Sequence, residues 1–169
     1  MTTDLQAAGA ADPRVNWSAA RDPVGPPSLR HRRDGILPAV AAALSIHDEV
    51  LTCTGAKGEQ PPVLHPIVQE FLDALPVAQR ERFTGRCAEA VLISRHLTAV
   101  EAGRGKRASR RPLTQSEARK ALRGAKLTAR RIREDADPAH GAYAPPCRSC
   151  APLLAHFGVR PFDPGAEGA

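Results

Sequence analysis

Three cysteines in this chain have the residue type and spacing of metal ligands. Cys147 and Cys150 lie three residues apart directly after Pro146, which fits a loop that enters the first turn of a helix. Their thiolates would then point the same way and occupy two corners of a zinc tetrahedron. Cys87, far upstream in the sequence, can supply the third corner. Three protein ligands leave the fourth position of zinc to water, which is typical of a catalytic rather than a structural site.

Glu89 is the residue that could use such a water. It follows Cys87 by two positions, on a stretch that reads as the start of a helix. From there a carboxylate can reach the activated water without binding the metal, and a helix N-terminus stabilises both a thiolate and a carboxylate. Three ligands, one water and one proton-carrying glutamate make up the arrangement of zinc-dependent deaminases, in which an all-cysteine ligand set is an accepted variant.

Three stretches of the chain together resemble one known family. They are Arg82-Phe-Thr-Gly-Arg-Cys-Ala-Glu89, the later Pro-Cys-x-x-Cys, and Leu64-His65-Pro66. The resemblance is to the YwqJ-type deaminases, a branch of the cytidine-deaminase-like superfamily that is often found in bacterial toxin systems, and it covers roughly residues 35 to 162. It implies one Zn²⁺ per chain, held by Cys87, Cys147 and Cys150, with Glu89 as the catalytic residue. Cys87 stands where better-known deaminases carry histidine, so water activation should depend more on Glu89.

The resemblance also implies where substrate is bound. In the family, the loop before the Cys-x-x-Cys lines the pocket, and here that loop spans residues 135–146. His65 is added because the exit of a hairpin before it would carry it toward the functional end of the sheet. A lone loop histidine is, however, more often simply solvated. The substrate-binding candidates are His65, Ala88, His140, Tyr143 and Pro145.

Two alternatives to a catalytic zinc stay open at this point. Cys53 is the fourth cysteine of the chain and could close a structural site. It stands in an apolar, β-branched run, where a buried free thiol is ordinary. A zinc-stabilised binding module without chemistry is the second alternative, but a structural site has no use for Glu89. Nothing at the start of the chain resembles a secretion signal, so a disulfide framework is not expected.

Composition limits the function further. The 169 residues suit one domain with tails, and a net charge of +6 favours anionic partners. No apolar run approaches 18 residues, so we expect no membrane span and a cytoplasmic protein, with secretion as a toxin effector as the alternative. The expected substrate is cytosine in a nucleic acid, such as a single strand, or in a nucleotide. Free purine or pyrimidine bases and nucleosides remain alternatives, and a homodimer is considered.

The remaining pattern predicts an α/β fold, the three-layer α/β/α sandwich with a mixed sheet of cytidine-deaminase-like proteins. We expect a disordered arm at residues 1–33, the deaminase domain at 34–162 and a flexible tail at 163–169. Both ligand-bearing helices should cover one face of the sheet. Helices are expected at residues 35–45, 66–75, 87–101, 114–123 and 147–157, and strands at 49–54, 62–64, 127–134 and 159–162.

A basic insertion separates the first ligand helix from the next helix. It contains three arginines and a lysine within seven positions and a further arginine at its end. It is interpreted either as a solvated loop or as an arm that contacts phosphates beside the site. Its cations are Arg104, Lys106, Arg107, Arg110 and Arg111.

Overall fold

A four-stranded mixed sheet forms the centre of the protein in the computed structural model, which describes residues 40–106, 108–134 and 136–166. The strands lie in the order β2, β1, β3, β4. Strand β1 (Val40–Ile46) pairs antiparallel with β2 (Glu49–Thr54) on one side and with β3 (Lys126–Arg131) on the other. The short β4 (Arg160–Pro161) runs parallel to β3 at the edge.

Strand β1 corrects one sequence-based prediction. The stretch 35–45 was expected to be a helix, but its part from Val40 onward is a strand. Its alternating Ala42, Leu44 and Ile46 are buried, and the hairpin turn at His47 joins it to β2. Alanine and leucine favour a helix locally, but β1 pairs with a strand on each side and buries one face, and this tertiary context prevails. The expected cap Asp34, the arm at residues 1–33 and Trp17 lie outside the described residues.

The other predicted elements are close to those observed, with one exception. Helix α2 (Pro66–Ala74), α3 (Ala88–Ala102), α4 (Gln115–Ala121) and α5 (Cys150–Phe157) each lie within two or three residues of an expected helix. The capping box of Thr114 and Glu117 is present, and Gly158 ends α5 in the left-handed conformation. The exception is residues 62–64, which form no strand and leave Val63 fully exposed. Single turns of 3₁₀ helix are η2 (Val77–Gln79) and η3 (Ala108–Arg110).

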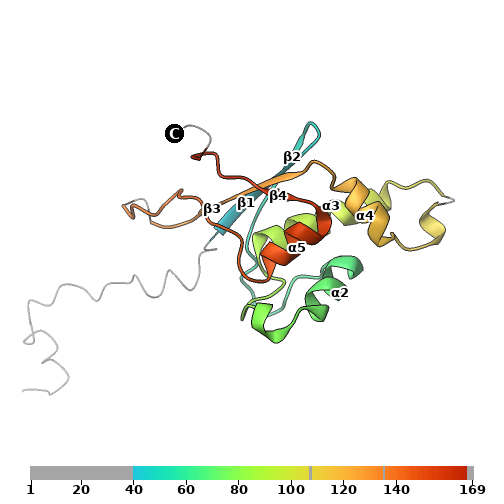
Figure 1. Ribbon diagram of the computed structural model, residues 1–169, viewed down its shortest axis with the longest axis horizontal. Coiled ribbons are helices and arrows are strands. Elements are labelled where there is room, and N and C mark those ends of the chain that lie inside the picture. The colour runs from blue at the N-terminus through green and yellow to red at the C-terminus, as the bar shows by residue number, and fades with distance from the viewer. Residues whose placement is uncertain (1–39, 107, 135, 167–169) are drawn as a thin grey trace, which may run out of the picture.

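Helices α2 to α5 of the described residues lie on the same side of the sheet (Figure 1). The inward side chains of β1 and β3 pack there against α3 and α5, whose Leu92, Leu153 and Phe157 are almost fully buried. The described residues therefore form two layers, one of strands and one of helices, so of the expected sandwich they contain the mixed sheet and one helical layer. None of the helices in the described part of the chain is long and apolar enough to span a membrane.

Candidate active site

The sulfur atoms of Cys87, Cys147 and Cys150 converge at the starts of two helices. Cys87 is the N-cap of α3, and Cys150 is the first residue of α5. A turn that begins at Cys147 leads into α5, because the Ala151 N–H donates to the Cys147 carbonyl at 2.9 Å. All three sulfurs lie within 4.8 Å of one another. Helices α3 and α5 lie side by side under the sheet, so residues distant in sequence meet at their N-termini (Figure 1).

The spacing of these sulfurs fits a tetrahedral ion. At a Zn–S distance of about 2.3 Å, tetrahedral geometry separates two sulfurs by roughly 3.8 Å. The Cys87 and Cys147 sulfurs are 3.6 Å apart. Among the described residues, no further cysteine, histidine or carboxylate joins this cluster. The donor set therefore fits a zinc ion with three protein ligands and one position for another ligand.

Contacts among the three cysteines shift the pKa values of their thiols in different directions. Hydrogen bonds from the Cys150 and Cys87 thiols lower the pKa of Cys147 to about 2. Hydrogen bonds with Cys147 and Cys87 raise the pKa of Cys150, and the hydrogen bond with Cys147 raises the pKa of Cys87 to about 12. These contacts favour a thiolate at Cys147 and disfavour one at Cys87 and Cys150. A metal ion that binds all three sulfurs as thiolates must displace any protons that they carry.

Glu89 lies beside the cysteine cluster and is only 5% exposed. It stands in the first turn of α3, two residues after Cys87. Burial raises the pKa of its carboxyl, and the charge of Cys147 adds to this, while hydrogen bonds from its own backbone N–H and from the Cys150 thiol oppose it. A carboxyl with a raised pKa is suited to accept a proton and to give it back.

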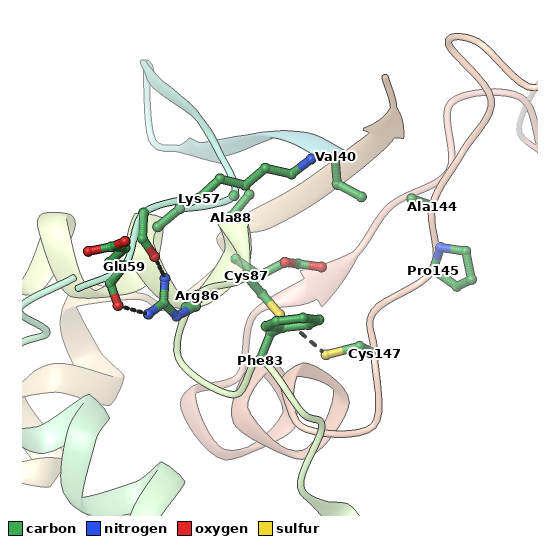
Figure 2. A pocket seen from close by; sticks show the side chains of 14 residues that line it. Val40, Lys57, Glu59, Phe83, Arg86, Cys87, Ala88, Ala144, Pro145 and Cys147 are labelled. Carbon is green, nitrogen blue, oxygen red and sulfur yellow. Dashed lines mark hydrogen bonds between the residues drawn. The ribbon is translucent and has the colours of Figure 1, made fainter. Parts of the chain in front are cut away.

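A cavity of about 820 Å³ opens over Glu89 and two of the three cysteines. Its walls come from Val40, residues 55–59, Phe83, residues 86–89, Ala144, Pro145 and Cys147 (Figure 2). Cys87 and Cys147 line it, whereas Cys150 is buried beneath them. A metal ion held by the three sulfurs would therefore face the cavity.

Arg86 fastens one wall of this cavity. Its guanidinium donates hydrogen bonds to the backbone carbonyls of Gly58 and Glu59, the latter at 2.9 Å. Its own carbonyl accepts a hydrogen bond from the Ala56 N–H at 2.8 Å. The loop after β2 is thus tied to the residue that precedes the first cysteine ligand, as Figure 2 shows. The sequence pattern did not single out this loop or Arg86 as part of the site.

Comparison of the sequence with models of known protein families gives a match. The model of the YwqJ-like deaminase family matches residues 25–159 of the 169. The chain belongs to the YwqJ-like deaminase family. No curated protein and no solved structure matches the chain.

The predicted substrate contacts of this YwqJ-like deaminase fall into two groups. Ala88 and Pro145 line the cavity. Tyr143 adjoins the wall that contains Pro145, and the charge of Glu89 contributes to the raised pKa of its phenol, after burial and the charge of Asp163. His140 is exposed, is not among the cavity residues, and bonds to the backbone of Arg133.

His65 is placed differently from the expectation. It does not line the cavity. Its Nδ1 accepts a hydrogen bond from the Ile67 N–H at the start of α2, and its Nε2 lies 3.1 Å from a carboxylate oxygen of Glu101. Its backbone N–H donates to Ser94 Oγ at 2.6 Å. These contacts join the start of α2 to Ser94 in the middle of α3 and to Glu101 near its end.

Cys53 does not belong to the metal cluster in the structure. Its half-buried thiol donates to the Ala88 carbonyl at 3.2 Å. Burial raises the pKa of this thiol, as expected for a packed, protonated cysteine.

The basic insertion lies at the opposite end of α3 from Glu89. The helix has 15 residues, so its two ends are roughly 22 Å apart. Two of the arginines are held by carboxylates, since Arg104 bonds to Glu101 and Arg111 to Glu117. None of the described residues of the insertion lines the cavity.

Proposed function

We propose that this YwqJ-like deaminase is a zinc-dependent hydrolase that deaminates a nucleobase, with cytosine in a nucleic acid or a nucleotide as its substrate. The observation that carries the proposal is the position of Glu89, a buried carboxyl with a raised pKa beside three converging cysteines and facing a cavity. A purely structural cysteine site would neither face a cavity nor place a carboxylate beside the metal.

The residues divide the chemistry between them. Cys87, Cys147 and Cys150 would hold zinc, which when bound supplies a Lewis acid that lowers the pKa of water. Glu89 takes one proton from the attacking water and passes it to the ring nitrogen while the water oxygen bonds to the amino-bearing carbon. Glu89 then takes the remaining proton from that oxygen and delivers it to the amino group, whose bond to carbon breaks so that it leaves as ammonia. The net change replaces a C–NH₂ group by a carbonyl, consuming one water and releasing one ammonia.

The cavity suits more than a bare base. Pockets of roughly 300–1,000 Å³ hold ligands of drug size, and this cavity of about 820 Å³ leaves room for a sugar beside the base. Lys57 and Arg86 supply two cations to its walls beside the carboxylates of Glu59 and Glu89, and a phosphate group placed near the two cations would be stabilised. The family resemblance supports cytosine as the base.

Ammonia release by the zinc-loaded protein tests this proposal. The substrates are bases, nucleosides, nucleotides and single strands that contain cytosine, adenine or guanine, with metal-stripped protein as the control. We expect release from cytosine in a nucleotide or a strand. Release from a purine, or from a free base or nucleoside alone, would replace the substrate assignment, and release from none of them would refute the deaminase proposal.

A further inference from the structure

Phe83 is an exposed aromatic side chain at the wall of the cavity. The residue is 61% exposed, and it borders the same cavity as Cys87, Cys147 and Glu89. In the described part of the chain, the other large hydrophobic side chains exposed to this degree are valines outside the cavity, namely Val50, Val63 and Val77. A phenyl ring left open at a cavity wall offers a flat apolar surface to a ligand.

Figure 2 shows how the Phe83 ring lies relative to the two cysteines that line the same cavity. Figure 2 shows the Phe83 ring in front of the line that joins the Cys87 and Cys147 sulfurs. Ala144 and Pro145 form a separate wall in the same view. The guanidinium of Arg82 lies 5.5 Å from the centroid of the ring. Because Phe83 lines the same cavity as Cys87 and Cys147, a planar heterocycle in that cavity can bring one of its carbons toward the cysteine cluster and a face toward the Phe83 ring.

The loop that carries Phe83 is fixed by the two residues between the metal-binding cysteines. Ser149 is fully buried, accepts a hydrogen bond from the Glu81 N–H at 2.8 Å, and donates to the Gln79 carbonyl at 3.0 Å. It also lies 3.0 Å from Thr84 Oγ1. Arg148 pairs with the Glu81 carboxylate at 2.9 Å. Residues on both sides of Phe83 are thus tied to the Cys147–Cys150 turn, which presets the ring before substrate arrives.

We propose that Phe83 stacks on the face of the heterocyclic base during deamination, and that Ser149 is a positioning residue that holds the Phe83 loop against the metal-binding turn. This inference rests on the proposed function and adds the residue that recognises the ring. It also explains why a buried serine lies between Cys147 and Cys150. Ser149 connects the metal-binding turn to the loop that carries Phe83 at the cavity wall.

Steady-state kinetics of Phe83 variants test the stacking. Phe83→Ala should raise KM by roughly 5- to 150-fold, the range given by base–aromatic stacking on alanine substitution. Phe83→Tyr should restore KM to near that of the wild type. Val77→Ala, at an exposed valine away from the cavity, is the control and should change neither KM nor kcat. All proteins are compared at equal zinc content.

A double-mutant cycle tests the role of Ser149. Ser149→Ala should raise KM in the wild type but add nothing once Phe83 is alanine, because it acts through that ring. Equal effects of Ser149→Ala in both backgrounds would overturn the positioning role. An unchanged KM in Phe83→Ala, with an active wild type, would overturn the stacking alone. A wild type that deaminates none of the substrates would overturn the proposed function, and the inference with it.

Discussion

The sulfur atoms of Cys87 and Cys147 lie 3.6 Å apart although 60 positions separate them in the sequence. The contact exists because α3 and α5 cover the same face of the sheet and begin at the same place. Each helix N-terminus contributes a partial positive charge that favours thiolates. The fold thus assembles, from two helix starts, a cysteine cluster that neither segment could form alone.

We expect two cysteine variants to differ in their zinc content. Cys147→Ser removes a central member of the cluster and should abolish stoichiometric zinc binding. Cys53→Ser should keep one zinc per chain, because the Cys53 thiol bonds to the Ala88 carbonyl instead of joining the cluster. Metal analysis of the purified variants measures both. A zinc-free Cys53→Ser protein would show that the site is a closed four-cysteine site.

Two lysines, Lys57 and Lys106, can show which part of the protein contacts the phosphates of a nucleic acid strand. Lys57 lines the cavity, whereas Lys106 belongs to the insertion at the far end of α3. Each phosphate contact releases counterions, with a slope of about 0.7 per contact for single strands in a plot of log affinity against log salt. We expect Lys57→Gln to flatten this slope by about that amount and Lys106→Gln to leave it unchanged.

Fluorescence anisotropy of a labelled single strand, titrated at several salt concentrations, gives the two slopes. A flatter slope for Lys106→Gln would show instead that the basic insertion contacts the phosphates of the bound strand. A wild type that binds no strand would favour the nucleotide as substrate.

The contacts of His65 predict a loss of stability without a loss of substrate affinity. His65→Ala removes the cap of α2 and the link to Glu101, and loss of an N-cap costs about 0.5–2 kcal/mol. Thermal unfolding should therefore occur at a lower temperature, with KM unchanged. Gln69→Ala, which removes an exposed hydrogen bond to Asp73 on the same helix, is the control and should change neither quantity. A raised KM in His65→Ala at unchanged stability would make His65 a substrate contact.

Much of the candidate site could be predicted from the sequence because its signals are local. The Cys-x-x-Cys after a proline and the Cys-x-Glu at a helix start each depend on a few neighbouring residues. Local signals also predicted where two other helices begin, namely Pro66 for α2 and the capping box at Thr114 for α4. Such signals act within one turn of a helix and need no knowledge of the rest of the fold.

The features that the sequence did not predict depend on distant partners. Val40–Ile46 looks helical by composition and becomes a strand only because two other strands flank it. Ser149 bonds to Glu81, 68 positions away, and no pattern around Ser149 indicates this partner. His65 was expected near the sheet's functional end, but the observed path of residues 55–65 leads it to Ser94 and Glu101. Phe83 appeared only within a family motif, although an aromatic residue in a polar loop is a signal worth testing.

The turnover of Glu89→Ala, measured as ammonia release from the best substrate at equal zinc content, tests the central claim most directly. Glu70→Ala, at an exposed glutamate of α2, is the control and should behave as the wild type. Because Glu89 carries every proton in the proposed reaction, its loss should exceed the roughly 10²- to 10⁴-fold of ordinary acid–base catalysis. We expect a folded, zinc-loaded Glu89→Ala protein whose kcat has fallen by several orders of magnitude. A Glu89→Ala variant that keeps a tenth of the wild-type activity would contradict it.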